Sequence, residues 1–120
     1  MTFVVEHLKI YQKSVDFADR ILVATEVFPR GYGFLADQLN RASVSISANL
    51  AEGNGRFTKP DRKHFFVIAR GSIQECIPLL ELAARRSLMK TDEQRRLYDN
   101  RDELAKMISG LIHGLERRSP

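Results

Sequence analysis

The positions of proline and glycine constrain the fold of this chain more than any other feature of its sequence. Only four prolines and seven glycines occur in 120 residues. Most of them lie between long stretches in which apolar residues recur every three or four positions, as on one face of an α-helix. No stretch alternates apolar and polar residues as a half-buried strand would. The sequence therefore predicts an all-α chain, with helices over about 6–28, 34–52, 59–88 and 92–116.

Each break between the predicted helices has a chemical cause. The run PRGYG (29–33) ends the first helix, because proline blocks helix continuation and glycine permits a tight reversal. Gly53 and Gly55 tolerate left-handed backbone after the second helix. The run TKPD (58–61) supplies an N-cap, a first-turn proline and an early acid, and TDEQ (91–94) has the spacing of a capping box. Four long helices with short connections predict an up-down-up-down antiparallel four-helix bundle, as one domain over 1–120.

The first predicted helix has two apolar stripes rather than one. The stripes consist of Leu8, Tyr11, Val15, Ala18 and Leu22, and of Ile10, Phe17, Ile21, Ala24 and Phe28. Because a helix turns by about 100° per residue, the two stripes are centred roughly 110° apart. We therefore expect this helix to have neighbours on two sides.

The composition indicates which cellular compartment and which class of binding partner to expect. A single cysteine, Cys76, cannot form an internal disulfide, and no apolar run is long enough for a signal peptide or a membrane span. We therefore expect a soluble, cytoplasmic protein that does not enter membranes. The net charge of +4 suits weak attraction to polyanions but is also common in proteins that bind none.

A ribbon of polar residues runs along the second predicted helix. Arg41, Ser45, Asn49 and Glu52 are spaced by four, four and three residues, so they share one face beside an apolar stripe. Buried polar groups are costly unless they are hydrogen-bonded. We therefore expect Ser45 and Asn49 to bond across helices or to the backbone. The ribbon either sets the register between helices or forms a ligand or partner site.

A second polar strip on the third predicted helix could face the first. Ser72 and Glu75 follow Gly71, whose missing side chain would let another helix approach closely. Arg101 interrupts the leucine stripe of the fourth predicted helix. We expect Arg41 or Arg101 to form an ion pair with Glu75. These seven residues are the predicted polar seam: Arg41, Ser45, Asn49, Glu52, Ser72, Glu75 and Arg101.

The third predicted helix is apolar on more sides than one bundle can cover. Residues 65–69 are apolar without interruption, and those of 79–84 nearly so. A large residual apolar patch on a soluble monomer usually marks an interface, so we expect self-association. The alternative is that these side chains pack under loops or neighbouring helix ends. The candidate interface residues are Phe65, Phe66, Ile68, Leu79, Leu80 and Leu82.

Both ends of the predicted bundle carry more cations than carboxylates. One end has seven cations against four acids, and the other has six against four. An oligomer would repeat each end and could hold nucleic-acid phosphates, although cations at helix C-termini also complement the helix dipole. The candidate nucleic-acid-binding residues are Lys9, Arg56, Lys59, Arg62, Lys63, Arg117 and Arg118.

No catalytic, metal or cofactor motif is present. Metal-binding bundles use Glu-x-x-His on two helices, and the nearest approach here is a single DRKH (61–64), which is more typical of a helix cap. The run GNGRFT lacks the Lys-Ser/Thr of a P-loop, and Cys76 is typical of a core residue. The sequence therefore predicts a protein that is not an enzyme and has no cofactor.

Four sequence runs resemble a known family. The runs QLNRASVSI (38–46), ANLAEG (48–53), GR (55–56) and ARGSIQE (69–75) closely resemble the four-helix-bundle proteins encoded in intervening sequences of 23S ribosomal RNA genes. The accessory variability proteins of diversity-generating retroelements belong to the same wider group. Two departures are Asn40, where the family often has a second arginine, and Ser47, where it often has proline. The matching motif positions are Arg41, Ser45, Asn49, Glu52, Gly53, Gly55, Arg56, Gly71, Ser72 and Glu75, and none has an assigned chemical role.

The resemblance implies a four-helix bundle that assembles into a ring-shaped homopentamer. It implies no catalytic activity, and it implies nucleic-acid binding for some members only. With the apolar excess, it leads us to predict a non-catalytic, self-assembling scaffold or interaction module. The alternative is binding of RNA or DNA backbone through the basic ends, with a nucleic-acid enzyme such as a reverse transcriptase as a possible partner.

Overall fold

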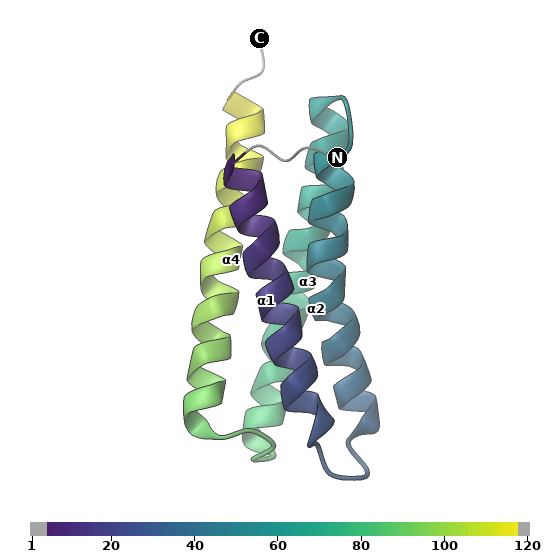
Figure 1. Cartoon of the computed structure of the whole chain (residues 1–120), viewed down its shortest axis with the longest axis vertical. Helices are drawn as coiled ribbons and strands as arrows, with labels where there is room; N and C mark the ends of the chain where they lie inside the picture. The colour runs from purple at the N-terminus through teal and green to yellow at the C-terminus, as the bar shows by residue number, and fades with distance from the viewer. Residues whose placement is uncertain (1–4, 118–120) are drawn as a thin grey trace.

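The computed structural model describes residues 5–117 of the chain, with side chains from residue 9 onward. Four helices account for this part of the structure: α1 (Val5–Glu26), α2 (Gly33–Asn54), α3 (Lys59–Arg85) and α4 (Thr91–Arg117). They run antiparallel as an up-down-up-down bundle of 52 × 20 × 20 Å (Figure 1). The α2–α3 loop lies at the same end as the start of α1 and the end of α4, and the other two turns lie at the opposite end. The predicted all-α bundle is confirmed.

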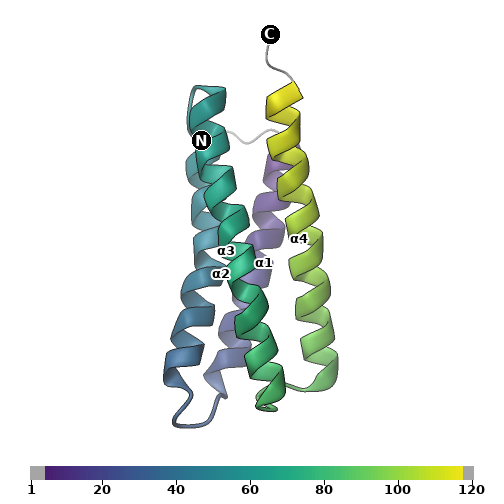
Figure 2. The same ribbon diagram turned by 180° about the vertical axis from the view of Figure 1, so that it is seen from behind.

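The helices pack in the cyclic order α1, α2, α3, α4, so α1 and α3 are diagonal and their backbones stay apart. Figure 1 views the bundle with α1 in front, and Figure 2, from behind, has α3 in front. Each helix buries one stripe in the common core, and burial of these apolar side chains provides the main driving force for folding. The largest fully buried side chains are Phe17, Ile21, Leu39, Ile46, Phe66, Ile73, Leu80, Leu97, Leu104 and Ile108.

The first helix has the two neighbours that its two stripes predict, α2 and α4, but the stripes are covered unequally. Phe17 and Ile21 of one stripe lie in the core. In the other stripe Ala18 is buried, whereas Val15 and Leu22 are exposed. Apolar side chains are therefore left on the outer surface of α1.

The helix ends differ from the predictions at two turns. α3 ends at Arg85 rather than near 88, because Ser87 adopts a left-handed backbone with φ of 57°. The Leu88 amide then donates to the Ala83 carbonyl and the Ser87 amide to the Ala84 carbonyl, each at 3.0 Å, which is a Schellman motif with serine in the usual glycine position. α1 likewise ends two residues early, at Glu26.

The glycines after the second helix do not adopt the predicted left-handed backbone. Gly53 lies inside α2, and Gly55 caps that helix with φ of −81°, in the right-handed region. The predicted cap of the third helix is present, since the Asp61 amide donates to the Thr58 hydroxyl at 3.2 Å. The left-handed glycine of the described chain is Gly31, with φ of 101°, in the α1–α2 turn.

Candidate interaction surfaces

A chain of hydrogen bonds joins α2 to α3 at mid-height. Asn49 Nδ2 donates to the Ser45 carbonyl at 2.8 Å and to Ser45 Oγ at 3.1 Å. Ser45 Oγ lies 2.9 Å from Ser72 Oγ, and Ser72 Oγ donates to the Ile68 carbonyl at 3.2 Å. Because the Ser72 proton is directed to Ile68, Ser45 is the donor between the two hydroxyls. The bonds run in one direction, Asn49 to Ser45 to Ser72 to Ile68, so each polarises the next.

Small side chains let the two helices approach closely along this chain. Ser72 is buried and Ser45 is half-buried, and both hydroxyls are satisfied. One turn further along α2, Gly53 packs against the Phe66 ring so tightly that a Cβ there would lie 2.6 Å from Phe66 Cε1. Phe66 is itself fully buried. The contact therefore fixes how α2 sits against the first half of α3.

Four members of the predicted polar seam lie elsewhere. Arg41 and Glu75 are exposed, and no ion pair links Glu75 to Arg41 or to Arg101, so the expected pairing is wrong. Arg101 is half-buried, with its guanidinium 4.9 Å from the Tyr98 ring centroid and 2.9 Å from Asp102. Because the arginine side chain is long, its aliphatic part can be buried while its guanidinium group lies at the surface of the same helix.

The remaining seam residue and the glycines also differ from expectation. Glu52 is exposed and pairs with Arg56 on the same helix end at 3.2 Å. Gly71 is exposed, and a Cβ built there would meet nothing within 4 Å, so it does not serve close helix packing inside the bundle. The seam between α2 and α3 therefore consists of Ser45, Asn49 and Ser72, with the Gly53–Phe66 contact beside it.

The sequence analysis missed a second polar link, between α1 and α2. Thr25 Oγ1 donates to Asn40 Oδ1 at 2.8 Å, and Thr25 is buried. Asn40 was noted only as a departure from the family motif. No signal in the sequence shows that residues 15 positions apart on two helices meet across a turn. The spacing of Thr25 on the edge of the buried stripe could have suggested a bonded hydroxyl.

Three of the seven predicted cations at the end formed by the α2–α3 loop are shown to be engaged within the chain. Arg56 stacks on Phe65, with 4.6 Å from its guanidinium carbon to the ring centroid, while pairing with Glu52. Arg62 Nε donates to the Arg56 carbonyl at 2.7 Å, and Lys63 pairs with Glu116 at 2.8 Å. The hydrogen bond from Lys63 lowers the pKa of Glu116. Lys59 is half-buried, Lys9 and Arg117 are exposed, and Arg118 lies outside the described residues.

The opposite end offers more exposed positive charge than the predicted one. Arg85 pairs with Glu81 at 2.9 Å, and Arg86 donates to the Tyr32 hydroxyl at 3.0 Å. The other cations at this end are exposed, and within the part of the chain that the structure describes none of them has an ion pair. They are Arg30, Lys90, Arg95 and Arg96.

The apolar excess of α3 is divided between core and surface. Phe66 and Leu80 are fully buried in the bundle core, so their prediction as interface residues is wrong. The other side of the consecutive apolar run faces outward, because neighbouring residues on a helix point about 100° apart. Phe65 and Leu79 are half-buried, whereas Ile68 and Leu82 are exposed. Ile68, Glu75 and Leu82 are spaced by seven and form one outward line, which we call the α3 face.

A second exposed apolar line lies on the diagonal helix. Val15 and Leu22 are seven residues apart and both about 40% exposed, at 40% and 39%. Val44 of neighbouring α2 is also exposed. We call Val15, Leu22 and Val44 the α1 face. Because α1 and α3 are diagonal in the bundle, side chains that project outward from these two helices lie on opposite sides of it.

The residues with catalytic potential are not assembled into a site. Cys76 is fully buried, and burial together with the charge of Glu75 raises its thiol pKa from 9.0 to about 12 despite the opposing effect of Arg101. His64 is exposed and packs edge-on against Phe65. Among the side chains described, those of residues 9–117, no cluster of three or more His, Cys, Asp or Glu could hold a metal ion. None of the described helices is both long and apolar enough to span a membrane.

The class of protein that these observations define is the all-α antiparallel four-helix bundle. The family follows from the sequence comparison. The chain belongs to the 23S rRNA-intervening sequence protein family, whose model matches residues 6–110. That match confirms the resemblance drawn from the motifs of α2 and α3.

A solved structure agrees with the fold. The chain is similar to a protein of unknown function from the S23 ribosomal protein family of Bacteroides thetaiotaomicron, with a TM-score of 0.83. The two share 22% sequence identity over 91% of this chain and 99% of that one. At this identity the likeness establishes the fold alone. No protein of curated function matches the chain.

Proposed function

We propose that this protein is a non-catalytic cytoplasmic scaffold that assembles with copies of itself into a ring. The observation that carries this proposal is the pair of exposed apolar faces on diagonal helices, the α1 face and the α3 face. One side of the bundle measures about 52 × 20 Å, or roughly 1,000 Å², which exceeds the ~800 Å² that each partner buries in a stable interface. The surface is therefore large enough for a lasting contact.

Two different faces favour head-to-tail assembly. If the α3 face of one copy binds the α1 face of the next, every added copy presents one free face again, and a ring forms when the rotation closes. An isologous dimer would use the same face twice and leave the other exposed. The family resemblance gives five as the expected number of copies. Glu75, central in the α3 face and without an ion pair inside the bundle, would then find a cation on the neighbouring copy.

Blocking one face at a time tests this proposal. Leu82→Glu and Leu22→Glu each place a charge on one exposed face, so we expect light scattering to give a ring for the wild type and monomers for either variant. Phe57→Glu is the matched control, since Phe57 is 98% exposed and lies on neither face. Mixing the two variants should give a one-to-one dimer through the two intact faces. A monomeric wild type, or a variant that dimerises alone, would contradict the ring.

A second candidate function is binding of RNA or DNA backbone, with a nucleic-acid enzyme as a possible further partner. The exposed cations Arg30, Lys90, Arg95 and Arg96 favour it, together with Lys9 and Arg117 at the other end. A ring would repeat each group around its axis and strengthen the attraction of phosphates. Titration with an RNA hairpin at two salt concentrations should show an affinity that falls steeply with salt and falls further in Arg30→Gln/Arg95→Gln. Salt-insensitive binding, or none, would rule this candidate out.

A further inference from the structure

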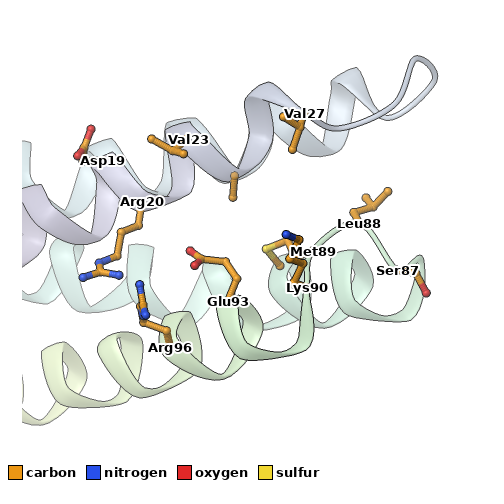
Figure 3. Close-up of a pocket in the computed structure, with 11 residues that line it drawn as sticks. Asp19, Arg20, Val23, Val27, Ser87, Leu88, Met89, Lys90, Glu93 and Arg96 are labelled. Carbon is orange, nitrogen blue, oxygen red and sulfur yellow. The ribbon is translucent and has the colours of Figure 1, made fainter.

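A groove opens between α1 and α4 at the end that holds the α3–α4 turn. It has a volume of about 660 Å³, and one wall runs from Asp19 on α1 to Val27, just after the end of that helix. Its opposite wall comes from Ser87 to Lys90 in the turn and from Glu93 and Arg96 of α4 (Figure 3). On the far side, the ion pair of Lys13 with Glu103, at 2.9 Å, ties α1 to α4. The groove therefore lies where the two helices diverge beyond that tie, as Figure 1 shows.

Two arginines line the end of the groove nearer the tie, and the rest is mainly apolar (Figure 3). The apolar part is lined by Val23 of α1, by Val27 just after the end of that helix, and by Leu88 and Met89 of the α3–α4 turn. Val27 is 76% exposed to solvent. Single apolar side chains are common on protein surfaces and need no explanation. Four of them around one cavity form an apolar patch, which is typical of an interaction site. The left-handed Ser87 is what turns the chain so that Leu88 and Met89 reach the groove.

The charges of the two arginines are not neutralised within the chain. In Figure 3, Arg20 and Arg96 extend toward each other from the facing helices, while Asp19 points away from the groove. Glu93 also extends toward α1, but neither arginine forms an ion pair with it or with any other described carboxylate. The lining of the groove as a whole carries more cations than carboxylates, namely Arg20, Lys90 and Arg96 against Asp19 and Glu93, so its net charge is +1. An occupant with a carboxylate at this end would be attracted.

The dimensions of the groove match a short helix. The eight steps from Asp19 to Val27 correspond to about 12 Å along α1, and three apolar side chains at positions i, i+4 and i+7 of a helix span about 10.5 Å. The groove is open along its length, so a small ligand would remain largely in water, whereas a helix would cover the exposed valines. Binding of an amphipathic helix between two others is a recurring mode of recognition.

We infer that this groove binds an amphipathic helix of a partner protein, with apolar side chains between α1 and α4 and carboxylates of its last turn at Arg20 and Arg96. The C-terminal end of a helix is also the negative end of its dipole, so this orientation adds to the attraction. The site shares no residue with the α1 face or the α3 face. The inference therefore goes beyond the proposed scaffold role and does not depend on ring formation.

The test uses two synthetic peptides of about 15 residues, each carrying leucines at i, i+4 and i+7 and a fluorescein label. One has two glutamates in its last turn and the other has two lysines, and a hydrocarbon staple on the outer side keeps both helical. With the full chain, fluorescence anisotropy should show binding of the glutamate peptide about tenfold tighter than binding of the lysine peptide. Arg20→Gln/Arg96→Gln should remove that preference. Arg30→Gln/Arg95→Gln, which makes the same charge change at the same end but outside the groove, should keep it.

The methionine methyl groups locate the bound peptide. The chain has three methionines, and labelling their methyl groups with carbon-13 places one NMR probe, Met89, in the groove and another, Met107, on α4 outside it. We expect the glutamate peptide to shift Met89 and not Met107. Equal affinity for both peptides, a Kd above about 1 mM, or an unmoved Met89 signal would overturn the inference. Dissociation of the wild-type assembly by Val27→Glu would also overturn it, because a second copy would then occupy the groove.

Discussion

The α2–α3 interface and the α1–α4 interface use different means of holding two antiparallel helices together. Between α2 and α3, a buried glycine contact and the bonds through Ser45 and Ser72 hold the two helices close together. Between α1 and α4, the described tie is the ion pair of Lys13 with Glu103, whose side chains are 36% and 52% exposed, and a groove opens beside it. One bundle thus contains a closed interface and an open one.

The difference teaches that the bundle does not need four equal interfaces. Exposed ion pairs contribute little to stability, with a median of about 0–1 kcal/mol, so the α1–α4 contact depends mainly on its share of the core. Satisfied buried hydroxyls and close backbone contact are specific to one register, and they fix α2 against α3. The open interface can then keep apolar surface exposed without endangering the fold. Such surface is what a partner needs.

The largest predicted effect compares the reactivity of the sulfur of Cys76, in the bundle core, with that of Met89, in the groove of the open interface. With its pKa raised to about 12, Cys76 has about a thousandfold less thiolate at pH 8 than a free cysteine, and burial protects it further. We expect iodoacetamide to leave it unmodified in the folded protein. Dilute hydrogen peroxide should oxidise half-buried Met89 within the same period. Mass spectrometry measures both, and rapid alkylation of Cys76 would show that α3 opens readily.

The same pKa shift makes stability depend on alkaline pH. The unfolded thiol loses its proton near pH 9.0, while the folded thiol keeps it until about pH 12. Between these values the unfolded state binds fewer protons, so the contribution of Cys76 to the free energy of unfolding falls as pH rises. The free energy of unfolding of the wild type, measured with urea, should therefore fall more steeply over this pH range than that of Cys76→Ala. Parallel pH profiles for the two proteins would contradict the expectation.

The next effect compares one glycine in the closed interface with one on α4. In Gly53→Ala the new Cβ would lie 2.6 Å from Cε1 and 2.8 Å from Cδ1 of the buried Phe66 ring, which has no room to move. We expect a loss of about 2–3 kcal/mol from overpacking, measured by urea unfolding. In Gly110→Ala the new Cβ meets nothing within 4 Å, so helix propensity should give a gain of up to about 1 kcal/mol. Equal effects at the two positions would mean that α2 and α3 are not closely packed.

A smaller effect tests the hydrogen-bond chain. Ser72→Ala removes the acceptor of the Ser45 hydroxyl and the donor to the Ile68 carbonyl, and should cost about 1 kcal/mol. Ser45→Ala should cost a similar amount, because it also removes an acceptor of Asn49. The double variant should lose less stability than the sum of the two single losses, since it contains no serine hydroxyl whose partner has been removed. Additive losses in urea unfolding would show that the two serines do not interact.

The fold could be predicted from the sequence because its signals are local. Apolar spacing, the breaks at residues 29–33 and the cap at Thr58 each act within a few residues, and all four helices form close to the expected positions. The end of α3 was placed too late because Ser87 takes a backbone conformation that favours glycine, and the amino-acid type gives no sign of it. The hydrogen bonds of the Schellman motif stabilise that conformation, which serine alone does not favour.

The surfaces were harder to predict because they depend on which side of a helix meets its neighbours. The run at residues 65–69 revealed excess apolar surface, but only packing decides that Phe66 turns inward and Ile68 outward. Charges were harder still. Arg41, Glu75 and Arg101 were paired in the prediction by helix level and sign, whereas in the structure the long arginine side chain of Arg101 turns to Asp102. The groove has no sequence motif, since it results from the divergence of α1 and α4.

The smallest predicted effect lies at the corner of the open interface, where Ser87 has φ of 57°. Ser87→Gly removes the steric strain of a left-handed non-glycine residue, but glycine also increases the freedom of the unfolded chain, so we expect a net gain of only about 0.5–1 kcal/mol. The gain should appear as a small rise in the urea midpoint with an unchanged slope. Ser109→Gly, inside α4, should instead lose about that amount by helix propensity. If Ser87→Gly were destabilising, the serine would be holding the α3–α4 turn by its side chain, and the shape of the groove would depend on that residue as well as on the divergence of the helices.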